Sequence, residues 1–197
     1  MREVELKSVV DDVMIRRQLV ELAGGRLLYE GSLEDLRYDT RSGKLRERDE
    51  VLRLRVYGGV GSTHAFLDWK GKTSFEDGYK VREEISSQVG SAELFKTILE
   101  KLGYVVIAEI GRWIAQYELG NAIVRFERYP RMDDLVEVEG EPADIERAIE
   151  AIGIARSEFN AKRLPYFVKQ YEQRTGNRAA LSERELKGDY DYSAEDV

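Results

Sequence analysis

The chain has 197 residues, a length typical of one domain, and 42% of them are hydrophobic, which is enough to form a core. It has no cysteine and a single histidine, His64, which excludes disulfides, thiol catalysis and zinc sites built on several imidazoles. The 31 Lys and Arg residues against 38 Asp and Glu give a net charge of −7, which argues against nucleic acid as a partner. The lack of cysteine fits a cytoplasmic protein, and we find no membrane-spanning run and no signal-peptide pattern.

Strand-like and helix-like segments alternate along the first half of the chain. Residues Arg2–Lys7 alternate charged and apolar side chains, which indicates a strand. Residues Asp11–Leu22 have the apolar spacing of a helix, which Gly24 and Gly25 end. Further strands are predicted at Arg26–Tyr29, Leu36–Asp39, Val51–Tyr57, His64–Lys70 and Tyr79–Ser86.

The second half begins with a helix that Ser91 can cap and that runs to Leu102. Strands then follow at Tyr104–Leu119, Ala122–Arg128 and Leu135–Glu139. A helix is expected from Pro142 to Gly153 and another from about Pro165.

Two parts of the chain are distinguished by this pattern. Residues 1–175 would form the folded domain, and residues 176–197 a polar, acidic tail that is frayed or disordered from about Leu181. About eight strands with a few amphipathic helices predict an α+β fold around a large antiparallel sheet or a closed barrel.

The strands carry charged residues on one face and apolar residues on the other. This alternation places one charged set together on the predicted strands: Glu3, Glu5, Lys7, Arg53, Arg55, Asp68, Lys70, Arg82, Glu84, Arg125, Glu127, Glu137 and Glu139. The helices need an apolar surface to cover, so helices outside a barrel would leave the charged face lining its lumen. Alternation alone does not exclude the simpler alternative, in which these charges face solvent.

Six segments, in chain order, resemble the signatures of the CYTH superfamily, also called triphosphate tunnel metalloenzymes. The first, Glu3-Val4-Glu5-Leu6-Lys7, matches the E-x-E-x-K signature. The others are EDLRYDT (34–40), VLRLRV (51–56), FLDWKGK (66–72), KVREEI (80–85) and LVEVEG (135–140). The resemblance covers about residues 1–170 and is carried by the order of the segments.

The resemblance implies an eight-stranded antiparallel β-barrel, or tunnel, with helices packed outside. Such a tunnel would bind a triphosphate chain with Mg²⁺ or Mn²⁺. The implied metal-side residues are Glu3, Glu5, Glu127, Glu137 and Glu139. The implied phosphate-binding residues are Lys7, Arg53, Arg55, Lys70, Arg82, Arg112 and Arg125, of which Lys7 and Lys70 are the candidate catalytic residues.

Three positions depart from the family pattern or match it loosely. Glu127 stands where the family usually has Asp, which leaves its role as a ligand in doubt. Ile114 stands where many members have a second basic residue after Arg112. Lys162 corresponds only by loose spacing to a late lysine of some members.

Three functions follow from the resemblance, and the sequence discriminates them poorly. The first is a metal-dependent phosphohydrolase acting on tripolyphosphate, ATP or thiamine triphosphate. The second is a class IV adenylyl cyclase that converts ATP to cyclic AMP and pyrophosphate. The third is a non-catalytic polyphosphate or nucleotide sensor, which the intact acidic set disfavours. The resemblance also allows a homodimer, on which the sequence is silent.

Overall fold

The computed structural model describes residues 2–59 and 62–189. It has nine strands in these ranges: β1 (Arg2–Val9), β2 (Arg26–Thr40), β3 (Val51–Gly59), β4 (Ser62–Lys70), β5 (Ser74–Glu76), β6 (Tyr79–Val89), β7 (Tyr104–Leu119), β8 (Ala122–Arg128) and β9 (Leu135–Glu139). The helices are α1 (Val13–Leu22), α2 (Lys44–Glu47), α3 (Ala92–Lys101), α4 (Pro142–Ile152), α5 (Leu164–Thr175) and α6 (Glu183–Leu186), with a 3₁₀ turn η1 (Arg156–Glu158).

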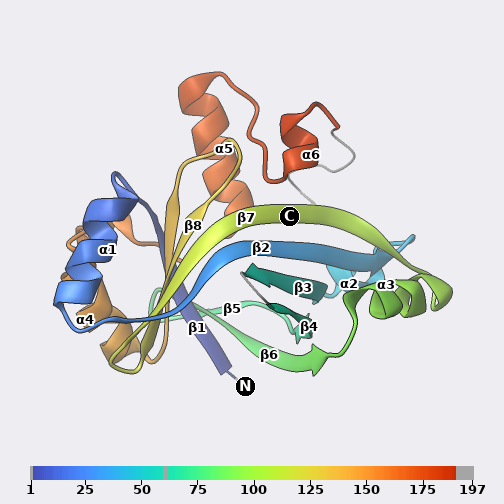
Figure 1. The fold of residues 1–197 in the computed structure, drawn as a ribbon, viewed down its shortest axis with the longest axis horizontal. Coiled ribbons are helices and arrows are strands. Elements are labelled where there is room, and N and C mark those ends of the chain that lie inside the picture. The colour runs from blue at the N-terminus through green and yellow to red at the C-terminus, as the bar shows by residue number, and fades with distance from the viewer. Residues whose placement is uncertain (1, 60–61, 190–197) are drawn as a thin grey trace.

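Eight of these strands close into an antiparallel barrel, as predicted. Their order is β1-β9-β8-β7-β2-β3-β4-β6, and pairing of β6 with β1 closes the ring. The short strand β5 adds to β6 beside this closure. The long strands β2 and β7 run together across the molecule (Figure 1).

The helices cover the outside of the barrel and are bounded by the residues that the sequence indicated. Asp12 caps α1 by accepting hydrogen bonds from the backbone N–H groups of Met14 and Ile15, and Ser91 caps α3. Pro142 lies in the first turn of α4, which ends at Gly153 in the left-handed conformation. Helices α1 and α4 lie at one end of the view and α3 at the other (Figure 1).

Three apolar clusters hold the helices against the strands. The largest joins α1 and α4 to the outer face of β1, β8 and β9 through residues such as Val20, Ile149 and Val138. A second packs α3 on β2 and β3, and a third packs Phe167 and Val168 of α5 beside Tyr129 and Leu135. Apolar side chains therefore lie between helices and barrel, and the opposite strand face is directed inward.

Two predictions of local structure need correction. The segments 26–29 and 36–39 are parts of one continuous strand, β2, because pairing with β7 extends along the whole of it. The expected frayed or disordered tail is also wrong for residues 181–189, where Leu181 is buried and α6 forms. The backbone N–H of Gly111 donates to the carbonyl of Leu181 at 2.8 Å, so this segment is fixed to β7. The rest of the predicted tail, 190–197, lies outside the described residues.

None of the helices over residues 2–59 and 62–189 combines the length and the apolar character needed to cross a bilayer.

Candidate functional site

A cavity of about 320 Å³ occupies the inside of the barrel. Ten basic and eight acidic side chains line it, so it carries a positive balance inside an acidic protein. All residues predicted to bind metal or phosphate line this cavity: Glu3, Glu5, Lys7, Arg53, Arg55, Lys70, Arg82, Arg112, Arg125, Glu127, Glu137 and Glu139. The prediction that charged side chains from different strands converge on one hollow is therefore confirmed.

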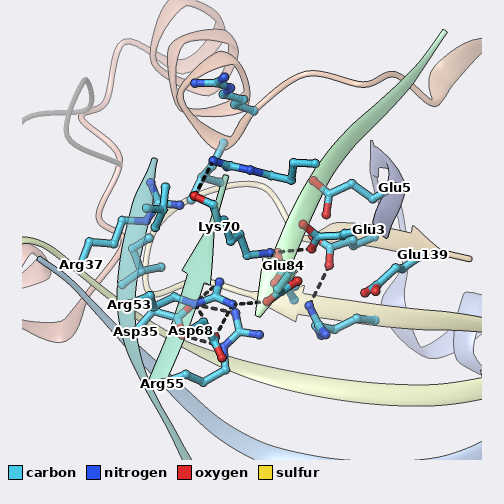
Figure 2. A pocket seen from close by; sticks show the side chains of 18 of the residues that line it. Glu3, Glu5, Asp35, Arg37, Arg53, Arg55, Asp68, Lys70, Glu84 and Glu139 are labelled. Carbon is cyan, nitrogen blue, oxygen red and sulfur yellow. Dashed lines mark hydrogen bonds and ion pairs between the residues drawn. The ribbon is translucent and has the colours of Figure 1, made fainter. Parts of the chain in front are cut away.

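One wall of the cavity consists of arginines held by aspartates; we call it the aspartate side. Asp35 accepts hydrogen bonds from Arg55 Nε at 2.7 Å and from Arg112 Nη1 at 3.0 Å. Asp68 accepts from Arg53 Nη2 at 2.6 Å and from the Ser86 hydroxyl at 2.6 Å. Figure 2 shows Asp35 of β2, Arg53 and Arg55 of β3, and Asp68 of β4 clustered together.

The charges on the aspartate side stabilise one another. Burial opposes the ionised form of Asp35, but Arg55, Arg53 and Arg112 outweigh it and hold its pKa well below the usual range. The same carboxylates hold the arginine side chains in fixed orientations.

The opposite wall, which we call the glutamate side, gathers carboxylates from β1 and β9. Glu5 on β1 lies directly across from Glu139 on β9, and Glu3 is two residues away on the same face. Lys70 donates to Glu3 Oε1 at 2.5 Å, and Lys80 donates to Glu5 Oε1 at 2.5 Å. Figure 2 shows Glu3, Glu5 and Glu139 on one side of the cavity, across from Arg37.

Two carboxylates on the glutamate side are incompletely satisfied by their surroundings. The Oε2 atom of Glu3 is buried without a hydrogen-bond partner. Burial raises the pKa of Glu139, and Glu3 and Glu5 raise it further against the opposing effect of Arg125. These oxygens are of the kind that a hard divalent cation takes as ligands. As the side chains stand, the described residues contain no group of three His, Cys, Asp or Glu arranged to hold a metal ion.

The other two predicted metal ligands are already held by cations. Glu127 accepts from Arg112 Nε at 2.9 Å and from the Tyr129 hydroxyl at 2.7 Å. Glu137 accepts from Arg125 Nη1 at 2.7 Å and its other oxygen contacts Lys7. Their geometry fits residues that position basic side chains better than residues that bind a metal.

Two basic predictions are also refined by their surroundings. Arg82 reaches the cavity, but its guanidinium donates to backbone carbonyls, including that of Gly71. Lys162 lies over the Tyr166 ring, whereas its neighbour Arg163 at the start of α5 lines the cavity.

Sequence reasoning missed four charged residues of the site. Asp35 lies in the part of β2 between the two shorter predicted strands, and Arg37 lies near the start of the second predicted strand, so neither was assigned to the charged face. Lys80 lies on the same face of β6 as Arg82 and Glu84, two residues before Arg82. The alternation of charged residues therefore included Lys80, but the prediction began at Arg82. Arg163 lies in the segment before α5, where no alternation could reveal it.

Comparisons with known proteins agree with the fold. No family model matches the chain. A protein of Methanocaldococcus jannaschii named "putative adenylate cyclase" is 29% identical over 110 residues, which are 56% of this chain and 60% of that protein. The match thus spans about 60% of the length of this curated relative.

Solved structures match over most of both chains. A "putative adenylate cyclase" of Vibrio parahaemolyticus has a TM-score of 0.72 at 16% identity, covering 85% of this chain and 97% of that one. A Pyrococcus horikoshii protein has a TM-score of 0.67 at 20% identity, covering 87% and 99%. A Hippeastrum "putative adenylyl cyclase", described as having a dominant triphosphatase activity, has a TM-score of 0.57 at 14% identity, covering 92% and 98%. At these identities the likeness shows a common fold.

Proposed function

We propose that the chain is a CYTH-type triphosphate tunnel enzyme, a divalent-metal-dependent phosphohydrolase acting on a triphosphate-containing substrate. The observation that carries this proposal is the cavity with a positive balance, in which fixed arginines lie across from carboxylates that are incompletely paired. Such a pair of walls suits a polyanion bound together with a cation. The ordered motifs and the names of the similar proteins give independent support.

The proposed division of labour follows the two walls. Arg53, Arg55 and Arg112 on the aspartate side would hold phosphate oxygens while the aspartates keep their orientation. Lys70 and Lys7 would stabilise the charge that develops on the transferred phosphoryl group. Hydrogen bonds that are already in place need little rearrangement when this charge develops.

Glu3, Glu5 and Glu139 are the residues that would hold the cation. The unpartnered Oε2 of Glu3 and the raised pKa of Glu139 support the proposal that this carboxylate set binds a divalent ion. When bound, Mg²⁺ or Mn²⁺ would neutralise negative charge on the phosphate oxygens. Lys70 and Lys80 now hold Glu3 and Glu5, so cation binding would compete with these ion pairs.

A class IV adenylyl cyclase is the second candidate, favoured by the names of several similar proteins. Both reactions use the same grip on a triphosphate and differ in the nucleophile, which is water for the hydrolase and the ribose 3′ hydroxyl for the cyclase. The Hippeastrum protein, which is named a putative adenylyl cyclase and described with a dominant triphosphatase activity, fits this close relation.

Product analysis would separate the candidates. The purified protein is incubated with Mg²⁺ or Mn²⁺ and with tripolyphosphate, ATP or thiamine triphosphate, and EDTA serves as the metal-free control. We expect release of orthophosphate that EDTA abolishes. Formation of cyclic AMP and pyrophosphate from ATP would show that the protein is a cyclase and not a hydrolase. Binding of a triphosphate without any product would favour the non-catalytic sensor.

Glu139→Gln tests the cation side with little disturbance of the fold. Glu139 has no ion pair among the described residues, whereas Glu5 is bound by Lys80 and Lys7. Glu5→Gln would therefore also remove the ion pair of Lys80 and one of the two ion pairs of Lys7. We expect the metal concentration for half-maximal rate to rise at least about tenfold, with the unfolding transition retained. Glu118→Gln, an exposed glutamate paired with Arg26 on the outside, is the matched control. An unchanged metal requirement in Glu139→Gln would remove this residue from the site.

A further inference from the structure

Arg37 differs from the other arginines of the cavity because, among the described residues, neither a carboxylate nor a backbone carbonyl holds its side chain. Its Nε atom is buried without a hydrogen-bond partner, and over residues 2–59 and 62–189 its side chain forms no ion pair. Burial and the nearby charge of Arg53 lower the pKa of Arg37 to about 10, against the opposing effect of Asp35. Arg37 therefore stays charged at neutral pH, at a cost that Asp35 offsets only in part.

Its immediate neighbours show what a structural arginine looks like in this barrel. Arg53 lies directly across from Arg37 on β3 and is held by Asp68, and Arg55 is held by Asp35. Arg112 is shared between Asp35 and Glu127. Each of these side chains has a carboxylate within hydrogen-bond distance, so the missing partner of Arg37 distinguishes it from all three.

The position of Arg37 in the cavity indicates that its missing partner would be an anion bound there. Arg37 lines the cavity, and Figure 2 shows it across from Glu3, Glu5 and Glu139. The register of β2 with β7 shifts between Arg37 and Tyr38, an irregularity of the kind that redirects side chains at functional sites. Arg53, Arg112 and Arg82 all lie near enough to disfavour the charge on Arg37, so this part of the cavity has cations in excess.

We propose that Arg37 binds the phosphate group that lies furthest from the glutamate side and thereby selects chains of three phosphates over chains of two. The inference rests on the proposed function, which supplies the polyphosphate. A pyrophosphate held by Lys7, Lys70 and the central arginines would leave Arg37 without a partner, whereas a third phosphate would extend the anion to it. Because the Arg37 guanidinium has no partner in the described part of the free protein and would gain one only with the third phosphate, it would determine specificity and would not stabilise the fold.

The test compares thermal unfolding of the full chain without metal, in EDTA, with tripolyphosphate or pyrophosphate as the added anion. We expect Arg37→Met to melt at the same temperature as the wild type or higher in the absence of anion, because no ion pair is lost. We expect its affinity for tripolyphosphate to fall about tenfold to a hundredfold, to the level of pyrophosphate. Arg37→Lys retains the positive charge but not the bidentate guanidinium, so its affinity for tripolyphosphate should lie between those of the wild type and Arg37→Met.

Two control variants make each outcome decisive. Arg55→Met removes an arginine held by Asp35 and should lower the melting temperature without anion. Arg26→Met, on the exposed start of β2, should change neither quantity. The inference is overturned if Arg37→Met keeps the preference for tripolyphosphate, if it melts as early as Arg55→Met, or if the wild type binds the two anions equally. If Arg37→Met loses affinity for tripolyphosphate as predicted, but the wild type with Mg²⁺ or Mn²⁺ releases no orthophosphate, the proposed hydrolase is overturned and the inference about Arg37 is retained.

Discussion

The aspartate side and the glutamate side of the cavity both combine carboxylates with basic side chains, but they differ in how completely the carboxylates are paired. On the aspartate side, Asp35 and Asp68 pair with Arg53, Arg55 and Arg112, so these three arginines have carboxylate partners before any ligand arrives. On the glutamate side, Glu3 keeps an unpartnered oxygen and Glu139 keeps a raised pKa. The difference indicates that Asp35 and Asp68 act as a scaffold that holds the arginines of their wall in place, while the glutamate side is incomplete until it binds a ligand.

Asp35→Asn should have the largest effect on stability. The change removes the carboxylate charge that Arg53, Arg55 and Arg112 share in the interior, and leaves buried guanidinium groups uncompensated. We expect the free energy of unfolding to fall by about 3–5 kcal/mol, measured by urea denaturation. Glu76→Gln, at an exposed pair with Arg2, serves as the control and should change it by less than about 1 kcal/mol. A loss for Asp35→Asn no greater than that of the control would refute the scaffold role of this wall.

Lys70→Met should have its main effect on turnover. Lys70 lies between Glu3 and Glu84 on the glutamate side, where the proposed chemistry takes place. We expect kcat for tripolyphosphate to fall about 100- to 1,000-fold, as for the loss of one charge-stabilising donor. Steady-state kinetics would check this, with Lys96→Met on the outer helix α3 as the control. A change confined to KM would show that Lys70 only binds substrate.

The pH dependence of stability should report the pairing of Glu127. Burial disfavours its ionised form, but Arg112, Lys7 and Arg125 outweigh burial and lower the pKa of Glu127 to about 2 from 4.5. A lowered pKa in the folded state gives a contribution that is complete above about pH 4.5 and is lost as the pH falls toward 2.

Glu127→Gln should therefore lower the stability near pH 7 by about 3 kcal/mol and flatten its decline between pH 4.5 and 2. Urea denaturation at a series of pH values would measure this, with Glu118→Gln as the exposed control. If the acid limb of the variant falls as steeply as that of the wild type, the pairing of Glu127 does not control it.

The parts of the site that could be predicted share one property, which is local alternation on a strand. Glu3 and Glu5, or Arg53 and Arg55, are two residues apart, so the sequence places them on one face before anything is known of the fold. The direction of that face came from the apolar stripes of the helices and from the family resemblance, because strand alternation is the same in a barrel and in an open sheet.

The parts that could not be predicted depend on pairing between distant segments. The role of Asp35 arises from Arg55, 20 residues away, and from Arg112, 77 residues away. The packing of Leu181 against the barrel depends on contacts with β7 that its polar surroundings in the sequence conceal. The missing partner of Arg37 is visible only once every neighbouring carboxylate has been assigned to another side chain.

A crystal structure of the protein with tripolyphosphate and Mn²⁺ would test the central claim most directly. We predict an anomalous peak for Mn²⁺ beside Glu3 and Glu139, and phosphate density that crosses the cavity from this wall to the aspartate side. A cavity without density, or a polyphosphate bound only on the outer surface, would contradict the account.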